Sequence, residues 1–172
     1  MSDRFSGKFI TLDTSTLIHD PRSMHKFGEK NKVGIHIATV EEIDGLKKCR
    51  DERGLNAREV SRQLLALKDA GQLGGPATYM DHRISILYAE DQFELLPPGF
   101  ERNNDNRILM LAIQMKAKGY NVVYVSQDAN TLLKAAACGI ESEIYKTDRL
   151  IDALGSLYSG RAELFIEDSS IH

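Results

Sequence analysis

The fold class follows from residues 103–125, which read NNDNRILMLAIQMKAKGYNVVYV. The polar residues at the start of this stretch are typical of a helix N-terminus, and Gly119 stands where a helix is expected to end. Between them, apolar side chains recur at the helical spacing of about 3.6 residues: Ile108, Leu111, Ala112 and Met115. The run 122–125 is β-branched and aromatic, as in a central strand. The stretch therefore predicts a helix that leads into a buried strand.

The same alternation of strand and helix extends over the rest of the chain. Strands are expected at residues 9–12, 33–38, 84–88 and 143–146, and residues 93–96 either continue the third strand or start another. Helices are expected at residues 41–48, 56–70, 130–137 and 149–158, with loops at 71–81 and 97–99. This order predicts an α/β fold, a three-layer sandwich in which helices flank both faces of a central, mostly parallel sheet.

Four acidic side chains stand at the ends of these apolar runs: Asp13, Glu42, Asp105 and Asp128. Asp13 and Asp128 each follow an expected strand. Glu42 follows the apolar run 33–40, and Asp105 opens a helix. Because the carboxyl ends of parallel strands meet at one edge of a sheet, these carboxylates are expected to converge. Converging carboxylates repel each other unless a hard cation lies between them, so the sequence predicts a Mg²⁺ or Mn²⁺ site and metal-assisted phosphate chemistry.

Each of these acidic residues, taken alone, has a simpler interpretation. Asp13 could cap the turn after a strand, and Asp105 or Asp128 could cap a helix. Capping does not require the side chains to converge, whereas a cation site does. Their joint recurrence at the ends of elements is what favours the site.

The bulk composition bounds the class of protein. The 172 residues are enough for about one domain, and 42% hydrophobic with 27% charged residues is ordinary for a soluble globular protein. No apolar stretch approaches the roughly 20 residues of a membrane span, and the N-terminal residues do not resemble a signal peptide. The two cysteines, Cys49 and Cys138, fit no zinc-binding spacing, so a cytoplasmic location is expected.

A local excess of positive charge follows the second acidic position, although the net charge of the chain is −3. Four basic residues in this region are candidates to hold an RNA backbone: Lys47, Arg53, Arg58 and Arg62. A basic surface beside a cation-loaded acidic pocket suits a polyanionic substrate. The alternative is a solvated helix face with i,i+4 ion pairs, which a run of charges alone favours.

Four short motifs resemble those of the PIN-domain ribonucleases: LDTS at residues 12–15, VEEIDGL at 40–46, NDNRIL at 104–109 and VSQDAN at 125–130. In that family an aspartate ends the first strand, and a glutamate precedes an aliphatic residue in the second motif. The third motif is an acidic helix start followed by an Ile-Leu pair, and the fourth has Ser or Thr two residues before Asp. The motifs occur here in the family's order within residues 9–140, which implies a PIN-like fold.

Three further stretches resemble the N-terminal PIN domain of two-domain PhoH-like proteins: TLIHDP at 16–21, EIDGLK at 42–47 and NAREVSR at 56–62. In those proteins a P-loop ATPase domain follows the PIN domain, but no G-x-x-x-x-G-K-[ST] motif is present in this sequence. The resemblance implies a PIN-like nuclease domain over residues 1–160 and a tail or linker over residues 161–172. It also implies a covalently linked PhoH-type ATPase as a partner.

The resemblance implies a Mg²⁺- or Mn²⁺-dependent endoribonuclease that cleaves single-stranded RNA by attack of a metal-activated water, leaving a 5′-phosphate and a 3′-hydroxyl. The implied catalytic residues and metal ligands are Asp13, Glu42, Asp105 and Asp128. Glu42 is preferred to the adjacent Glu41 because it directly precedes Ile43, as in the family pattern. Four side chains are expected to support the carboxylates or contact phosphate: Thr14, Ser15, Ser126 and Asn130.

Two alternative functions stay open at this point. The domain could bind RNA without cleaving it and act as a regulatory module for a PhoH-type ATPase. It could instead be a phosphotransfer domain, such as a receiver or a haloacid-dehalogenase-like phosphatase, because these also place an aspartate after the first strand. Ser15 stands where the phosphatase pattern requires a second aspartate, which disfavours that class. PIN domains commonly pair, so the resemblance also implies a homo-oligomer.

Overall fold

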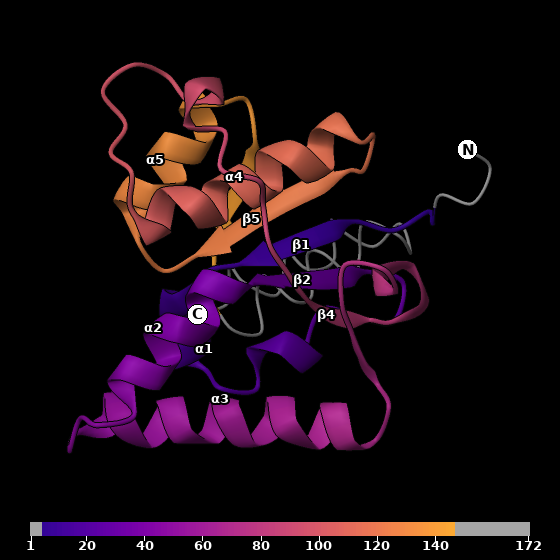
Figure 1. The fold of residues 1–172 in the computed structure, drawn as a ribbon, viewed down its shortest axis with the longest axis vertical. Helices are drawn as coiled ribbons and strands as arrows, with labels where there is room; N and C mark the ends of the chain where they lie inside the picture. Colours follow the sequence, from indigo (N-terminus) through magenta and orange to yellow (C-terminus); the bar gives the residue numbers. More distant parts are fainter. Residues whose placement is uncertain (1–4, 147–172) are drawn as a thin grey trace, which may run out of the picture.

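A computed structural model describes residues 5–146 of the chain and shows a central sheet of six strands in that region (Figure 1). The strands are β1 (Phe9–Leu12), β2 (Lys32–His36), β3 (Leu73–Gly74), β4 (Ile84–Leu87), β5 (Val122–Ser126) and β6 (Glu141–Ile144). Their order across the sheet is β3-β4-β2-β1-β5-β6, and each neighbouring pair is parallel. The parallel sheet expected from the sequence is confirmed.

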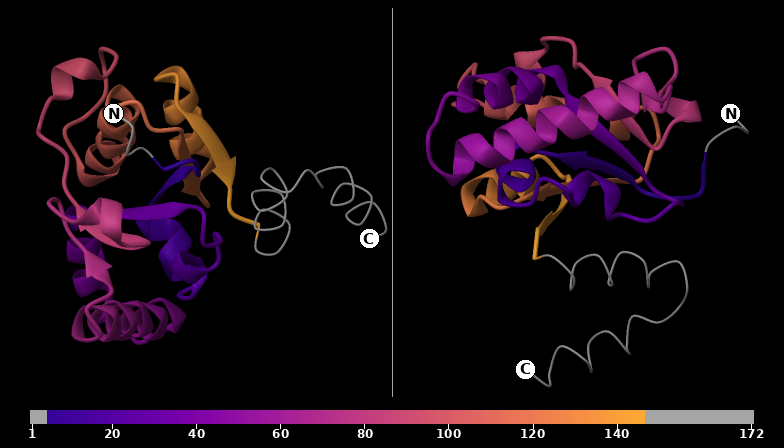
Figure 2. Two further views of the ribbon diagram at one scale, coloured as in Figure 1. Left: turned by 90° about the vertical axis from the view of Figure 1, so that its right-hand side faces the viewer. Right: turned by 90° about the horizontal axis from the view of Figure 1, so that it is seen from below.

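Helices cover both faces of this sheet. The α-helices between residues 5 and 146 are α1 (Thr14–His19), α2 (Ile37–Leu46), α3 (Glu52–Asp69), α4 (Asn104–Ala117) and α5 (Ala129–Ala137). Three short 3₁₀ helices accompany them: η1 (Ser23–His25), η2 (Tyr79–Asp81) and η3 (Phe93–Leu95). Figure 1 shows α3 on one side of the sheet and α4 with α5 on the other, and the views in Figure 2 agree. The predicted three-layer sandwich is therefore confirmed.

Each face of the sheet has its own apolar core, because alternate residues of a strand point to opposite faces. In β1, Ile10 packs in the cluster that contains Val60 of α3, whereas Phe9 packs in the cluster that contains Ile108 of α4. A strand that is buried on both faces is apolar at nearly every position, which explains why β1 and β5 were easy to locate in the sequence.

The boundary between β2 and α2 differs from the sequence prediction. The strand expected at residues 33–38 ends at His36, and the helix expected at 41–48 begins at Ile37. His36 is the N-cap of α2, because its Nδ1 accepts a hydrogen bond from the backbone N–H of Ala38 at 2.9 Å. The apolar run continues unbroken through this boundary, so hydrophobicity alone did not reveal it.

Further predictions were wrong in detail. The helix expected at 56–70 begins at Glu52, and the loop expected at 71–81 contains β3 and η2. Residues 93–95 form the 3₁₀ helix η3 rather than a strand, and Pro97 and Pro98 follow at once with no backbone N–H to give to a strand ladder. The last strand lies at Glu141–Ile144 rather than at 143–146. The helix expected at 149–158, the domain limit at 160 and the tail at 161–172 lie outside the described residues. No helix of residues 5–146 is long and apolar enough to cross a membrane.

Candidate active site

The candidate site lies at the carboxyl ends of β1 and β5, where the strand order reverses. From β1 the chain continues to β2 on one side, whereas β5 pairs with β1 on the other side. Parallel sheets have a crevice at such a point because the connections leave toward opposite faces. Asp13 directly follows β1, and Asp128 lies two residues beyond the end of β5. The topology therefore brings these two aspartates to one place.

A cavity of about 490 Å³, here called the acidic cavity, opens at this point. It is lined by Asp13, Thr14, Ser15, Ile18, Glu42, Leu46, Arg53, Asp105, Asp128 and Thr131. All four acidic residues singled out in the sequence are thus brought together, from the ends of two strands and from α2 and α4. Thr14 and Ser15, two of the four expected supporting residues, also line the cavity.

Asp13 is buried and held by hydrogen bonds on both carboxylate oxygens. It is the N-cap of α1, and its Oδ1 accepts from the backbone N–H and the hydroxyl of Thr16, each at 3.1 Å. The Ser15 hydroxyl donates to the same oxygen at 2.8 Å, and the Ser126 hydroxyl donates to Oδ2. Burial raises the pKa of the Asp13 carboxyl, although these hydrogen bonds oppose the rise. The carboxylate is therefore fixed in orientation.

Asp128 is held in a similar way at the start of α5. Its Oδ1 accepts from the backbone N–H of Asn130 at 3.0 Å, and its Oδ2 accepts from the Thr131 hydroxyl at 3.0 Å. Ser126 joins the two aspartates, because its hydroxyl donates to Asp13 and accepts from the backbone N–H of Asp128 at 2.9 Å. Ser126 thus contacts both aspartates from below the cavity lining, to which neither Ser126 nor the exposed Asn130 belongs.

Glu42, rather than Glu41, faces the acidic cavity. Its half-buried carboxylate accepts a hydrogen bond from the Thr14 hydroxyl. Burial raises the pKa of Glu42, and the negative charges of Asp105 and Asp13 raise it further. Glu41 is exposed and lines a neighbouring cavity instead. The three carboxylates line the same cavity, which is why their charges act on one another.

Asp105 differs from the other three carboxylates because the fold does not hold it. It is an exposed residue in the first turn of α4, and Asn103, not Asp105, caps that helix through the backbone N–H of Asn106 at 2.9 Å. Within residues 5–146, the Asp105 carboxylate has no hydrogen bond or ion pair. The capping role considered for Asp105 is therefore wrong, while capping is confirmed for Asp13 and Asp128.

Tyr124 of β5 provides a second sign that the four negative charges lie close together. Its side chain is fully buried, and its hydroxyl has no hydrogen-bond partner among the described residues. Burial is the largest cause of its raised pKa. The charges of all four site residues raise the pKa further, and these residues are Asp13, Asp105, Glu42 and Asp128. One buried hydroxyl is thus within electrostatic reach of the whole set.

The carboxylate oxygens at the site are the type of ligand that a hard divalent cation prefers. Four carboxylates facing one cavity supply the oxygen ligands that Mg²⁺ and Mn²⁺ prefer, and the negative charges of Asp105 and Asp13 raise the pKa of Glu42 beyond the effect of its burial. The side chains line the cavity but do not converge closely: no three His, Cys, Asp or Glu residues between 5 and 146 form a cluster that could hold a metal ion. The carboxylates of Asp13 and Asp128 accept hydrogen bonds from their own helices, α1 and α5, as N-caps.

The basic residues expected to hold RNA are only partly brought to the site. Arg53 lines the acidic cavity and pairs with Asp51 at 3.0 Å. Lys47 lines the neighbouring cavity, and its backbone carbonyl accepts a hydrogen bond from Arg58 Nη1 at 2.8 Å. Arg62 pairs with Glu59 one turn earlier on the same helix, an i,i+3 pair in place of the i,i+4 spacing of the solvated-face interpretation. Arg58 and Arg62 line neither cavity.

Sequence reasoning missed two threonines of the site, Thr16 and Thr131. Each stands three residues after a capping aspartate and donates its hydroxyl to that aspartate. The same spacing, aspartate followed by threonine at the third position, occurs in the sequence at Asp13 and Asp128 and is a usable signal for a carboxylate held by a cap.

Comparison with known proteins places this arrangement in context. Residues 10–146 match a family described as PIN domain. The chain is 35% identical to the protein PhoH2 of Bacillus subtilis over 93% of this chain and 38% of that protein. It is 36% identical to the PhoH2 of Thermobispora bispora over 93% of this chain and 36% of that protein. The chain thus spans little more than a third of the curated relatives that it matches.

A solved structure supports the fold alone. A domain of a functionally unknown protein from Methanocaldococcus jannaschii superposes with a TM-score of 0.52 at 20% identity. The match covers 82% of this chain and 93% of that domain. The parallel sheet flanked by helices is therefore an arrangement already observed in another protein.

Proposed function

This chain belongs to the PIN-domain family, whose members are generally metal-dependent nucleases, and from that premise we propose that it cleaves single-stranded RNA with a divalent cation, Mg²⁺ or Mn²⁺. The observation that carries the proposal is the acidic cavity, where Asp13, Glu42, Asp105 and Asp128 face one space at the strand-order reversal. Chemistry on a phosphodiester suits such a site because the substrate is anionic and needs a cation beside it.

The four carboxylates have distinct tasks in this proposal. Asp13 and Asp128, held by helix caps and by Ser126, supply fixed oxygen donors. Asp105 and Glu42 supply donors that can adjust to the ion and the substrate. A divalent cation held there would acidify an attacking water and neutralise charge on the phosphate oxygens.

Glu42 is also placed to act as a general base. The Thr14 hydroxyl holds its Oε1, which leaves Oε2 able to orient a water and accept its proton during attack on the phosphorus. The raised pKa of Glu42 suits this task because it brings the carboxylate closer to the working pH. Breakage of the P–O3′ bond then leaves a 3′-hydroxyl on one product and a 5′-phosphate on the other.

Arg53 is the basic residue best placed to hold the substrate backbone. Its exposed guanidinium lies at the acidic cavity, and its only described ion pair is the exposed contact with Asp51. Such surface pairs contribute little free energy, so a phosphate can replace Asp51 at low cost. We place Lys47, Arg58 and Arg62 outside the cleavage site.

The proposal is tested by incubating the purified chain with labelled single-stranded RNA in Mn²⁺, Mg²⁺ or EDTA. Cleavage should require the cation and should fall at least about a hundredfold in Asp105→Asn. Asp69→Asn is the matched control, because Asp69 is an exposed helical aspartate about 24 Å along α3 from Arg53. Equal cleavage by wild type and Asp105→Asn would refute the assignment of the site.

A second candidate is a non-cleaving RNA-binding or regulatory module for a PhoH-type ATPase. The chain spans only 36–38% of relatives named PhoH2, so a longer protein with a linked domain is part of this proposal. RNA binding without cleavage at any Mn²⁺ or Mg²⁺ concentration, by a folded wild type, would favour this second function.

A further inference from the structure

Tyr88 is the one aromatic residue among residues 5–146 that is exposed, at 62% of its surface. It directly follows β4 and therefore lies at the same carboxyl edge of the sheet as Asp13, which directly follows β1. Strand β2 separates these two strands, so the backbone at Tyr88 is about 10 Å from that at Asp13, two strand spacings. An exposed aromatic ring thus stands beside the acidic cavity.

The backbone that carries Tyr88 is fixed, although the ring itself is exposed. The N–H of Glu90 donates to Gln114 Oε1 at 3.0 Å, and the Glu90 carbonyl accepts from Gln114 Nε2 at 2.8 Å. The Asp91 carboxylate pairs with Arg107 at 3.3 Å. Both contacts tie the segment after β4 to α4. An aromatic ring on a rigid support loses little conformational entropy when it binds, which suits a binding surface.

Ile37 provides a second exposed apolar side chain next to Tyr88. The paired strands β2 and β4 end at His36 and Leu87, which are register partners. The residues that follow, Ile37 and Tyr88, therefore continue from neighbouring strand ends. Ile37 is 46% exposed, although it is an isoleucine in the first turn of α2. The two side chains form an apolar surface that no described residue covers.

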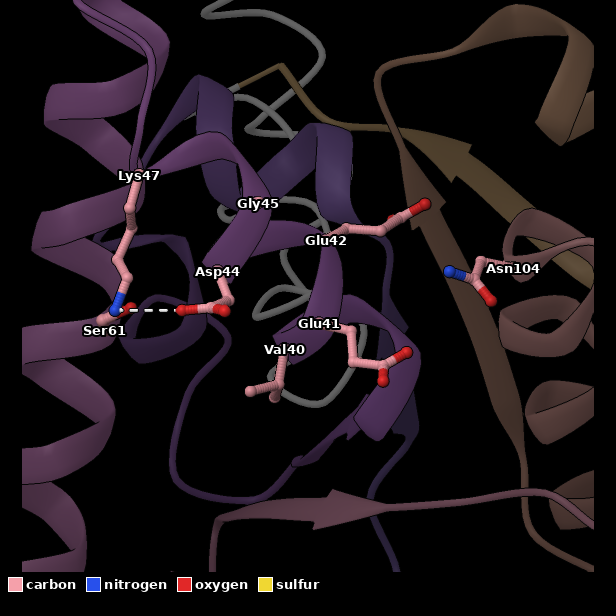
Figure 3. A pocket seen from close by; sticks show the side chains of 8 residues that line it. All are labelled: Val40, Glu41, Glu42, Asp44, Gly45, Lys47, Ser61 and Asn104. Atoms are coloured by element: carbon pink, nitrogen blue, oxygen red, sulfur yellow. Dashed lines mark ion pairs between the residues drawn. The ribbon is translucent and has the colours of Figure 1, made fainter.

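A cavity of about 640 Å³, here called the α2 cavity, leads from the acidic cavity toward this surface. It shares Glu42 with the acidic cavity. Its lining is Val40, Glu41, Glu42, Asp44, Gly45, Lys47, Ser61 and Asn104 (Figure 3). Figure 3 shows the side chains of Glu41 and Glu42 extending from α2 toward that of Asn104. Ile37 lies one turn before Glu41 on the same face of α2, so the α2 cavity opens toward Ile37 and Tyr88.

Little positive charge is available along this path to hold a phosphate. The basic residue in the lining of the α2 cavity, Lys47, pairs with Asp44 at 3.3 Å. Arg107 pairs with Asp91 and also donates to Asn104 at 3.1 Å. RNA on this side is therefore held through its bases rather than its phosphates, and an aromatic face binds an unpaired base by stacking.

We propose that Tyr88, with Ile37 beside it, is a stacking platform for an unpaired base of the RNA strand that reaches the acidic cavity through the α2 cavity. The inference rests on the proposed binding of RNA at the acidic cavity. In a duplex, both faces of a base are covered by its neighbours, so this contact selects single strands over duplexes. It tolerates any base, because every base has a π-face.

The sequence contains no tryptophan, so Tyr88→Trp places a single fluorescent reporter on the platform. The variant is titrated in Mg²⁺ with a short single-stranded RNA, with fluorescence extrapolated to the moment of mixing. Stacking should quench the tryptophan in step with binding, measured by the anisotropy of a labelled copy of the RNA. A duplex of the same sequence should leave the tryptophan unquenched. Leu65→Trp is the matched reporter at an exposed position of α3 and should not be quenched by either RNA.

The contribution of the natural ring is measured with the same RNA and cation. Tyr88→Ala should weaken single-strand binding about tenfold, the effect of losing one stacked base. Tyr88→Phe should change it less than about twofold, because a phenyl ring also stacks. Leu65→Ala, which truncates an exposed apolar side chain elsewhere, should bind as the wild type does. Unchanged affinity in Tyr88→Ala, or bound RNA without quenching in Tyr88→Trp, would overturn the inference.

Cleavage in later samples of the same mixtures separates this inference from the proposed nuclease function. Cleavage without quenching would overturn the platform and leave the nuclease standing. Quenching without cleavage would support the platform and count against the nuclease, whereas no RNA binding at all would overturn both. Sedimentation of wild type and Tyr88→Ala tests the other occupant of this surface, a second copy of the chain. Loss of self-association with unchanged RNA affinity would assign Tyr88 to an interface between copies and overturn the inference.

Discussion

The two sides of the acidic cavity are built in different ways. On the β1 and β5 side, Asp13 and Asp128 are helix caps whose carboxylate oxygens all accept hydrogen bonds, with Ser126 between them. On the α2 and α4 side, Glu42 accepts one hydrogen bond from Thr14, and Asp105 is exposed without a partner among the described residues. One side is fixed by the fold, and the other is free to adjust.

In the proposed function, Asp13 and Asp128 serve both as helix caps and as oxygen donors to the cation. A cap fixes the orientation of the side chain at no added cost, which is what a preorganised site requires. Glu42 and Asp105, on the free side, are less constrained. Carboxylates that repel each other can then move apart when no cation is bound. Substitutions on the fixed side should therefore affect mainly stability, and substitutions on the free side mainly cation binding.

The largest effect on stability is expected from Asp13→Ala. The change removes the N-cap of α1, worth about 1 kcal/mol, and leaves the buried donors of Ser126 and Thr16 without their acceptor, which costs about 1–3 kcal/mol more. Chemical denaturation should show a loss of roughly 2–4 kcal/mol. Asp51→Ala is the matched control because Asp51 caps α3 at an exposed position, and it should lose only about 1 kcal/mol. Equal losses of unfolding free energy in the two variants would contradict the inference that buried hydrogen bonds fix Asp13.

Much of the fold was predictable because the burial of both sheet faces makes the central strands continuous apolar runs. Residues 9–12 and 122–125 were located almost to the residue. The start of α2 was not predictable, because Ile37 and Ala38 extend the apolar run of β2 and the capping residue is a histidine, His36. Histidine is not among the usual N-cap residues, so the boundary carried no recognisable signal.

The site was predictable as a set of positions but not in its internal contacts. The convergence of Asp13 and Asp128 follows from strand order, and their caps follow from local spacing. The bond between Thr14 and Glu42 joins residues 28 positions apart and depends on how α2 packs beside α1, which no local pattern encodes. The burial of the Tyr124 hydroxyl under the site likewise depends on tertiary packing.

A smaller effect, opposite in sign, is expected from Tyr124→Phe. The Tyr124 hydroxyl is buried and lacks a partner among the described residues, in contrast to the fully bonded Asp13. Removing an unpaired buried hydroxyl while keeping the ring should raise the free energy of unfolding by about 1 kcal/mol in cation-free buffer. Tyr88→Phe changes an exposed tyrosine and sets the baseline. A loss of stability in Tyr124→Phe would show that the hydroxyl is bonded within the fold.

The smallest effect is expected from Glu42→Gln and depends on pH. The folded-state pKa of Glu42 lies above its ordinary value of 4.5, so the ionised carboxylate destabilises the cation-free fold. The variant should match the wild type at low pH and become more stable than it as the pH rises through the folded-state pKa. The gain should be a few tenths of a kcal/mol, because solvent screens the half-buried group. Denaturation at several pH values tests this, and a gain confined to low pH would reverse the assigned sign.

The fixed and free carboxylates should act together as one cation site, and calorimetric titration of Mn²⁺ into the apo chain tests this. Wild type and the distant control Asp69→Asn should bind Mn²⁺ with equal affinity. Asp105→Asn should stay folded, because no described residue bonds to the Asp105 carboxylate, and should bind Mn²⁺ at least about tenfold more weakly. Undiminished Mn²⁺ affinity in Asp105→Asn would contradict the claim.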